Sequence, residues 1–274
     1  MTAPPDTTLT GRLNGLDWPA LTERLDADGF ALTGPLLTAA ECAELAGLYG
    51  EERRFRARIA MARYRFGVGD YAYFAEPLPP LVQELRETLY GRLAPVANAW
   101  AARGRRAAEQ GAAAARGMVA ARGAAAARGA VAARGAAGSG ETYPPTLAGF
   151  LRRCHAAGQR RPTPLLLRYE AGGYNCLHQD LYGSVAFPLQ ATCFLSRPGT
   201  DYSGGEFLLV EQRPRQQSRG TALVPAQGAL AIFPSAERPV PGRRGFLRAR
   251  VRHGVSTVTA GSRYTLGIVF HDAQ

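Results

Sequence analysis

The sequence has 274 residues, of which 46% are hydrophobic, enough to form one large domain or two of ordinary size. Its formal net charge is +11, and all of its basic residues are arginines. We find neither a charged start followed by an apolar run nor an apolar stretch long enough to cross a bilayer, which argues against the secreted and membrane-spanning classes.

The first hundred residues carry the patterns of several helices. Residues 18–25 have the apolar spacing of an amphipathic helix. Thr38 and Glu41 form a capping box in front of a second helix. Residues 81–100 again place large apolar side chains at helical spacing. We expect residues 1–100 to form a helical support within a single domain that spans the whole chain.

A repetitive segment covers residues 101–140. The unit Ala-Ala-Arg-Gly recurs with arginine at 116, 122, 128 and 134, a period of six that matches neither a helix face nor a strand face. The segment holds seven arginines and one acid, Glu109, so it contributes 7 − 1 = +6 to the net charge of +11. It has few large apolar side chains to offset the entropy of ordering. We interpret it as a low-complexity insertion, flexible or loosely helical. An arginine-rich arm for a polyanion is the alternative.

After this insertion the pattern changes from helix to strand. A short helix is expected at residues 147–155. Short runs of β-forming residues with glycine and proline between them then follow, at 165–169, 187–195, 206–211, 229–233, 246–251 and 264–270. Many short strands at close spacing are typical of a sandwich or barrel. The sequence therefore predicts an α+β fold, a double-stranded β-helix (jelly roll) formed by residues 141–274 as the catalytic core and braced by the N-terminal helices.

Two potential metal ligands lie two residues apart in the first part of this core. His178 and Asp180 project to the same side of an extended chain. A third ligand must come from another strand, and His253 directly follows a predicted β run. His155 lies in a predicted helix and His271 at the end of the chain. Two histidines and one carboxylate on one face of a metal leave positions open for O₂ and a chelating co-substrate, an arrangement typical of Fe(II).

A histidine two residues from an aspartate is common by chance, and a solvated pair is the alternative. Arg263 and Thr265 strengthen the interpretation because they follow His253 closely. We expect residues 254–262 to connect two strands of a hairpin, with Gly261 in the turn. Arg263 and Thr265 would then present a guanidinium fork and a hydroxyl to a carboxylate in the same cavity. An acidic side chain elsewhere in the fold is the alternative partner for Arg263.

The segments His178-Gln-Asp180, His253 and Arg263-Tyr-Thr265 resemble the signature of the Fe(II)/2-oxoglutarate-dependent dioxygenase superfamily. The spacing of ten residues from His253 to Arg263 is similar to that of the prolyl-hydroxylase branch. Tyr169, nine residues before His178, stands where the resemblance implies a contact with the far carboxylate of 2-oxoglutarate.

A second set of residues resembles the AlkB-type nucleic-acid dealkylases. The His-Gln-Asp triplet and Arg263-Tyr-x-Leu266 fit that branch, whereas Leu167 and Val269 stand where it has an asparagine and a second arginine. The match covers about residues 164–272. Outside the insertion, the whole chain resembles uncharacterised prokaryotic 2-oxoglutarate Fe(II) oxygenases proposed to act on damaged nucleic acid.

The resemblance implies a dioxygenase that hydroxylates a C–H bond. Its cofactors would be Fe(II), held by His178, Asp180 and His253, with O₂ and 2-oxoglutarate as co-substrates and ascorbate in support. Arg263, Thr265 and Tyr169 would bind 2-oxoglutarate. Oxidative dealkylation of damaged nucleic acid is the function that we favour. A peptidyl (prolyl-type) or small-molecule hydroxylase is the alternative, and a cupin-like metal-binding module without turnover is a more remote one, since cupin-type sites use more histidines.

The expected partner follows from the distribution of arginines. A nucleic acid would contact the insertion together with an arginine-rich stretch that contains Arg243, Arg244, Arg248 and Arg250. Arg248, Arg250 and Arg252 share one face of a strand, although the solvated outside of a barrel gives the same pattern. The four cysteines are scattered, which favours the reducing cytoplasm over a disulfide scaffold. We expect a cytoplasmic protein without a membrane partner.

Overall fold

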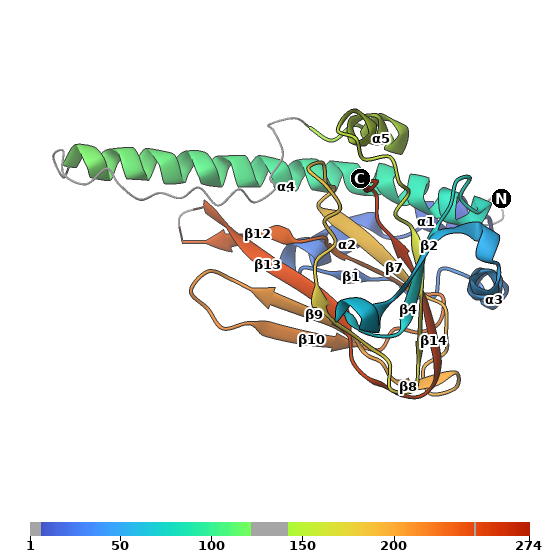
Figure 1. Ribbon diagram of the computed structural model, residues 1–274. Coiled ribbons are helices and arrows are strands. Elements are labelled where there is room, and N and C mark those ends of the chain that lie inside the picture. The colour runs from blue at the N-terminus through green and yellow to red at the C-terminus, as the bar shows by residue number, and fades with distance from the viewer. Residues whose placement is uncertain (1–6, 122–141, 244) are drawn as a thin grey trace, which may run out of the picture.

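The computed structural model describes residues 7–121, 142–243 and 245–274. Five α-helices and three short 3₁₀ helices lie mostly in the first part of the chain. The α-helices are α1 (Leu9–Asn14), α2 (Trp18–Ala27), α3 (Ala39–Gly47), α4 (Pro80–Ala121) and α5 (Leu147–Ala156), and the 3₁₀ helices are η1 (Leu48–Gly50), η2 (Glu52–Arg54) and η3 (Met61–Tyr64). Figure 1 shows α4 running across the top of the molecule, with its end projecting past the strands.

Two antiparallel sheets form the body of the protein. The larger has the order β1-β11-β7-β14-β5-β4-β2, with β8 against β14, and the smaller has the order β10-β9-β13-β6-β3, with β12 against β13. Their bounds are β1 (Ala31–Leu32), β2 (Phe55–Ala60), β3 (Gly67–Val68), β4 (Asp70–Phe74), β5 (Leu165–Glu170), β6 (Tyr174–His178), β7 (Leu189–Phe194), β8 (Tyr202–Gly204), β9 (Phe207–Gln212), β10 (Arg219–Leu223), β11 (Leu230–Pro234), β12 (Glu237–Gly242), β13 (Gly245–Val255) and β14 (Val258–Ile268). The chain passes repeatedly from one sheet to the other, which makes the predicted double-stranded β-helix.

Alternating side chains divide the larger sheet into two faces. On β14, Leu266 and Ile268 belong to the main hydrophobic core, which also contains the buried faces of α1, α3, α4 and α5. On β11, Ala231 and Phe233 point the other way, into a second cluster shared with Phe207 of the smaller sheet. Successive strand residues project to opposite faces. The helices therefore cover the outside of the larger sheet, and the space between the sheets is available for a site.

The predicted helix at residues 81–100 is longer in the structure. The helix α4 begins at Pro80 and continues into the predicted insertion as far as Ala121. The first residues of α4 beyond the expected boundary are anchored to α2, because Arg103 pairs with Asp26 at 2.6 Å. Residues 122–141 of the insertion lie outside the described residues.

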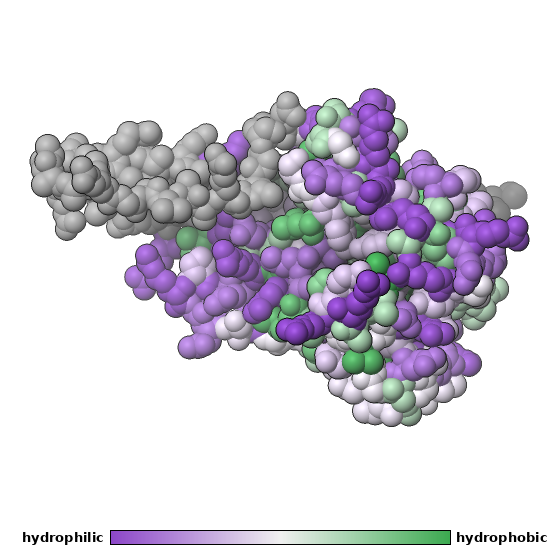
Figure 2. Space-filling view, in the orientation of Figure 1, coloured by the Kyte–Doolittle hydropathy of each residue, from purple (hydrophilic) through white to green (hydrophobic). Residues whose placement is uncertain are grey.

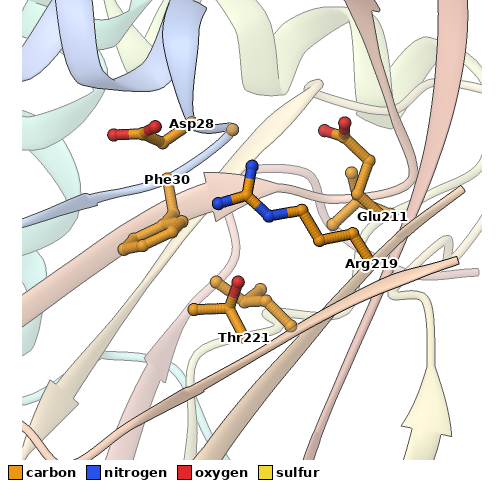
Figure 3. Close-up of a pocket in the computed structure, with 8 residues that line it drawn as sticks. Asp28, Phe30, Glu211, Arg219 and Thr221 are labelled. Atoms are coloured by element: carbon orange, nitrogen blue, oxygen red, sulfur yellow. The ribbon is translucent and has the colours of Figure 1, made fainter. Parts of the chain in front are cut away.

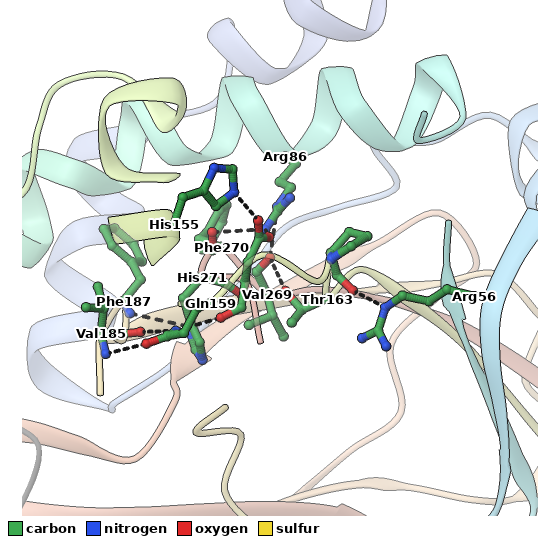
Figure 4. A network of polar contacts seen from close by, with 12 residues as sticks. Arg56, Arg86, His155, Gln159, Thr163, Val185, Phe187, Val269, Phe270 and His271 are labelled. Atoms are coloured by element: carbon green, nitrogen blue, oxygen red, sulfur yellow. Dashed lines mark hydrogen bonds and ion pairs between the residues drawn. The ribbon is translucent and has the colours of Figure 1, made fainter. Parts of the chain in front are cut away.

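Helix α4 is joined to the end of the chain by a buried polar network (Figure 4). The Arg86 guanidinium donates to the carbonyls of Val269 and Phe270 and pairs with Asp272 at 2.8 Å. His155 of α5 meets the other oxygen of Asp272 at 3.0 Å. Arg86 is only 1% exposed, so its charge depends on these partners. The network fixes β14 and the chain after it against the helical layer.

Several predicted elements are confirmed and others differ. The capping box of Thr38 and Glu41 forms in full at the start of α3. Residues 1–100 also contribute β2 and β4 to the larger sheet, so this part is not only helical. The four cysteines are free. Among the described helices, none is long and apolar enough to cross a membrane.

The predicted hairpin between His253 and Arg263 is wrong. The strand β13 continues to Val255 and β14 already begins at Val258, and the two strands belong to different sheets. Gly261 lies within β14 with a φ of +75°, where a Cβ would meet the backbone oxygen of Asp201 at 2.1 Å. It serves this close approach to β8 and does not form the turn. The chain crosses between the sheets here, so His253 and Arg263 face the same interior from opposite walls.

Candidate functional site

The two predicted histidine ligands lie directly opposite each other on neighbouring strands. His253 of β13 pairs with His178, the last residue of β6. Their ring centroids are 4.2 Å apart. Asp180 follows β6 and brings its Oδ2 to 3.2 Å from His253 Nε2, while its Oδ1 lies 3.6 Å from His178 Nε2. One potential ligand atom from each residue lies within 4.8 Å of the others. The sheet register thus assembles the three side chains that the sequence selected.

The orientation of His178 leaves one ring nitrogen available. Its Nδ1 lies 2.8 Å from the carbonyl oxygen of Cys176, which can only accept a hydrogen bond. Nδ1 therefore carries the proton, and Nε2 keeps its lone pair toward Asp180 and His253. Burial lowers the pKa of His178, and the neighbouring His253 lowers it further, so the imidazole is neutral at pH 7. A neutral imidazole is the form that binds a metal.

Asp180 is held by groups on both sides. The Tyr182 hydroxyl donates to its Oδ1 at 2.7 Å. Burial alone would raise the pKa of Asp180, but His253, His178 and Tyr182 outweigh that effect and hold the pKa well below its ordinary value. Between the ligands, the Gln179 side chain donates to the backbone carbonyls of Ala236 and Val251. These contacts fix a segment that has no strand partner of its own and keep the carboxylate ionised.

Arg263 lies inside the fold without a counter-charge in contact with it. It is 1% exposed, and its three guanidinium nitrogens have no hydrogen-bond partner among the described residues. The rings of Tyr169, Phe194 and Tyr202 surround it at 5.6–5.7 Å. Burial lowers the pKa of Arg263, yet a guanidinium stays protonated in proteins. A buried and unpaired cation is costly, so this cage calls for an anionic ligand.

Tyr169 connects the Arg263 cage to the histidine–aspartate cluster. It pairs with Arg263 across β5 and β14, and burial raises its pKa to about 12. The positive charge of Arg263 lowers that pKa and the negative charge of Asp180 raises it further. Thr265 is buried two residues after Arg263 and projects to the same face. All six predicted site residues therefore line one interior.

The donor set fits both groups that the sequence implies. Two imidazoles and one ionised carboxylate match the ligands of a non-haem iron site with open positions. The orphaned guanidinium matches the far carboxylate of a dicarboxylic acid, for which arginine is the usual bidentate partner. His178, Asp180 and His253 would hold the metal, and Arg263, Thr265 and Tyr169 would hold the co-substrate.

The other histidines do not join this cluster. His155 lies in α5 and pairs with Asp272. His271 is fully buried, and its Nδ1 accepts from the backbone N–H of Phe187, while its ring packs 5.7 Å from Tyr182. Burial lowers the pKa of His271 to about 4, so it stays neutral. It lies behind the site and supports Tyr182.

A small pocket lies next to His253 (Figure 3). Its lining includes Leu209, which pairs with His253, and Val251, two residues before it. Figure 3 shows the Arg219 guanidinium directed toward Asp28 and Phe30, with Glu211 beside it on the paired strand. The volume is about 20 Å³, room for roughly one water molecule. This pocket does not accommodate a co-substrate.

Two residues that contact the site were missed by the sequence analysis. Tyr182 donates to Asp180, and Asn175 donates to the Tyr169 hydroxyl at 3.2 Å. The position of Tyr182 two residues after Asp180 was a usable signal, because a side chain at that distance can reach the carboxylate. Asn175 gave no such signal, since its role depends on a β-bulge between β6 and β13.

Comparison with known families finds a match over most of the chain. A family model described as "Oxygenase, catalysing oxidative methylation of damaged DNA" matches residues 69–133 and 126–273. Two uncharacterised proteins from strains of Mycobacterium tuberculosis are each 43% identical over 201 residues, which covers 73% of this chain and 72% of theirs.

Solved structures with a similar fold include two hydroxylases. A prolyl-4-hydroxylase from Pseudomonas putida is 12% identical, with a TM-score of 0.46, over 94% of this chain and 100% of that one. A prolyl hydroxylase from Trichoplax adhaerens, in complex with a hypoxia inducible factor peptide, is 14% identical, with a TM-score of 0.47, over 96% and 92%.

Proposed function

This chain belongs to the Oxygenase-NA family, and we propose that it is an Fe(II)- and 2-oxoglutarate-dependent dioxygenase that removes N-alkyl groups from damaged nucleic acid. One observation carries the co-substrate assignment. The Arg263 guanidinium is buried and lacks a hydrogen-bond partner among the residues described. It lies in the same interior as two histidines and a carboxylate. An oxygenase that consumed no anionic co-substrate would have no use for this costly group.

The proposed reaction balances with the co-substrates that the site accommodates. When bound, Fe(II) supplies the oxidation of a C–H bond by O₂, coupled to conversion of 2-oxoglutarate to succinate and CO₂. If the oxidised carbon is an N-methyl group, the product is a hemiaminal that breaks down to formaldehyde and the free amine. If it is a ring or chain carbon, a stable alcohol remains.

The residues of the chain bind, orient and shield. His178 presents a neutral imidazole beside the ring of His253, and Tyr182 fixes Asp180 through its Oδ1. Arg263 and Thr265 orient the co-substrate by its far carboxylate, with Tyr169 beside them. Phe207 and Phe233 pack against the His253 ring at 6.0 and 4.8 Å and exclude water from that side.

The family description supports the choice of nucleic acid as the substrate. The net charge of +11 favours a polyanion as well. A peptidyl or small-molecule hydroxylase needs no such charge, although it would use the same metal and co-substrate residues. The two functions therefore differ in the substrate and not in the residues that bind the metal and the co-substrate.

Formaldehyde release tests the proposal directly. The full chain is incubated with Fe(II), 2-oxoglutarate, ascorbate and an N-methylated oligonucleotide, and formaldehyde and succinate are measured together. We expect both products in equal amounts from the natural chain. His253→Ala should release neither and should bind Fe(II) about ten-fold or more weakly, because a ligand is lost.

His155→Ala is the matched control, since this histidine lies outside the site, and it should keep both activities. Succinate without formaldehyde, together with no binding of DNA at any salt concentration, would favour the peptidyl or small-molecule hydroxylase. Full activity in His253→Ala would overturn the metal assignment.

A further inference from the structure

Exposed hydrophobic side chains gather beside the strand that carries His178. The described chain has nine large hydrophobic side chains that are exposed, and six of them lie on η3, β3 and β6 or within three residues after η3 or β6. These six are Tyr64, Phe66, Val68, Tyr174, Leu177 and Leu181. Such residues scattered singly need no explanation, but six of them on neighbouring segments indicate an interaction surface.

Two aromatic rings dominate this surface. Tyr64 and Phe66 are 47% and 48% exposed and stack on each other, with centroids 5.6 Å apart and planes at 19°. The backbone N–H of Cys176 donates to the Phe66 carbonyl, and Val68 pairs with Tyr174. The aromatic pair is therefore fixed to β6, the strand that ends at His178.

The same segment carries two cations. Arg63 holds its guanidinium 5.7 Å from the Tyr64 ring, and Arg65 is exposed between the two aromatic residues. Neither arginine makes an ion pair within the part of the chain that the structure describes. The segment between β2 and β4 lies toward the viewer in Figure 1, and this face in Figure 2 is largely hydrophilic with separate hydrophobic groups.

More aromatic rings lead inward from this pair to the metal ligands. Tyr71 meets Tyr73 edge to face at 5.4 Å, and Tyr73 meets Tyr182 at 6.1 Å. Tyr182 is the residue that donates to Asp180. Tyr71 packs against the buried cluster that contains Met61 of η3 and Tyr169. The Arg56 guanidinium covers the Tyr73 ring at 4.5 Å.

We propose that Tyr64 and Phe66, flanked by Arg63 and Arg65, form a stacking platform for an unpaired nucleic-acid strand, whose target base enters along Tyr71, Tyr73 and Tyr182. Exposed aromatic rings interleaved with arginines bind single strands because every base has a face that stacks, while the cations meet the phosphates. The platform rests on the proposed function and adds to it the form of the substrate. A second copy of this chain fits the surface less well, because it would bring the same positive charge to it.

Fluorescence anisotropy with the full chain, loaded with Fe(II) and 2-oxoglutarate without O₂, tests this platform. The probes are a labelled single strand of about 12 nucleotides, within the footprint expected for such grooves, and the same strand in a blunt duplex. We expect the single strand to bind more tightly than the duplex. Tyr64→Ala and Phe66→Ala should each weaken that binding by about 5- to 150-fold, the range for loss of one stacked base.

The controls separate stacking from a loss of fold. Tyr64→Phe keeps the ring and should keep the affinity. Leu32→Ala and Val224→Ala remove exposed hydrophobic side chains elsewhere and should leave Kd unchanged. The melting temperature of each variant checks that it is folded.

Three results would overturn the platform. If the natural chain binds the strand and releases formaldehyde, but Tyr64→Ala and Phe66→Ala change neither Kd nor KM, the platform is wrong and the proposed function stands. Equal affinity for single strand and duplex would have the same meaning. If Phe66→Ala instead abolishes self-association of the chain, the surface joins two copies. A natural chain that neither binds nucleic acid nor releases formaldehyde contradicts the proposed function itself.

Discussion

The guanidinium of Arg263 is charged and has no hydrogen-bond partner among the described residues, and the aromatic rings around it cannot replace one. A cation–π contact contributes roughly 0.5–2 kcal/mol, whereas the burial of an ion costs several kcal/mol. The remaining free-energy cost of burying the guanidinium is offset only when a carboxylate binds in the cage. At the residue scale, the affinity for 2-oxoglutarate should therefore depend strongly on this one side chain.

Replacement of Arg263 tests that dependence. Arg263→Ala should raise the KM for 2-oxoglutarate by about two orders of magnitude or more, since loss of one partner of a buried charged pair costs roughly 3–5 kcal/mol. Fe(II) binding should change little, because Arg263 is not a ligand. The measurement is succinate formation against 2-oxoglutarate concentration, with Fe(II) affinity determined separately.

Two variants serve as controls for this prediction. Arg263→Lys keeps the charge but loses the planar fork, so its KM should lie between those of the natural chain and Arg263→Ala. Arg168→Ala removes an arginine of the adjacent strand that pairs with Asp70 and Glu170, and it should leave the KM unchanged. An unaltered KM in Arg263→Ala would mean that another residue binds the carboxylate.

Tyr182 acts on the metal through Asp180. Its hydroxyl holds Oδ1 and so directs Oδ2 toward His253. Tyr182→Phe should lower the affinity for Fe(II) about 10- to 100-fold, the usual effect of losing a group that orients a ligand. The affinity is measured by titration with Fe(II) in the absence of O₂.

Tyr90→Phe is the matched control for this change. It also removes a buried tyrosine hydroxyl that donates a hydrogen bond, but the acceptor is the carbonyl of Pro144, far from the ligands. Equal Fe(II) affinities in both variants would show that Tyr182 only fills space.

At the scale of elements, helix α4 and the chain after β14 depend on the pair of Arg86 and Asp272. Asp272→Ala would leave Arg86 buried with only backbone carbonyls as partners. We expect the free energy of unfolding to fall by about 3–5 kcal/mol, because the remaining charge is uncompensated. Urea denaturation measures the change.

The exposed pair of Arg24 and Asp28 gives the comparison. These side chains are 72% and 37% exposed and 3.5 Å apart. Asp28→Ala should cost less than about 1 kcal/mol, since solvent screens the interaction. If Asp272→Ala destabilises the protein no more than this, the buried pair does not hold the helix.

The sequence predicted those elements whose signal is local. The capping box at Thr38 and the six β runs of the core depend on neighbouring residues, and the structure contains them. The strands β2 and β4 were missed, because their side chains alternate only weakly between buried and exposed. They are stabilised by long-range pairing, of β4 with β5 and of β2 with β4. The end of α4 was misplaced because glycine only weakly opposes a helix that a long preceding segment has already nucleated.

The sequence predicted more of the site than of the fold around it. Residue types and spacing selected His178, Asp180 and His253 because few other histidines exist. The route from His253 to Arg263 was wrong, since spacing alone cannot distinguish a hairpin from a crossing between sheets. The support from Asn175 and Gln179 depends on a bulge and on distant carbonyls, which no local pattern reveals.

At the scale of the whole molecule, the positive charge has an uneven distribution. Arg248 and Arg250 are exposed on the outer face of β13, opposite the buried side chains of Val251 and His253. Arg238, by contrast, is buried and pairs with Glu211 at 2.6 Å, so it is not available to phosphates. Arg244 lies outside the described residues. Since β13 adjoins β6, and β6 adjoins β3, the exposed arginines and the aromatic platform belong to one sheet.

This arrangement predicts how DNA binding responds to salt. Each phosphate contact releases counterions, so log Kd for a single strand should change with log salt by about 0.7 per contact.

Glu237 lies 3.6 and 3.9 Å from Arg248 and Arg250 and offsets part of their charge, but Arg250 is 73% exposed and can turn to a phosphate. The double variant Arg248→Ala/Arg250→Ala should weaken binding of every sequence alike and flatten the slope by about 0.7 per lost contact. Anisotropy titrations at several salt concentrations measure the slope, with Arg24→Ala/Arg54→Ala as the control that removes two exposed, paired arginines elsewhere. An unchanged slope in the β13 variant would move the phosphate path to another face, whereas flattening in both variants would indicate only a response to total charge.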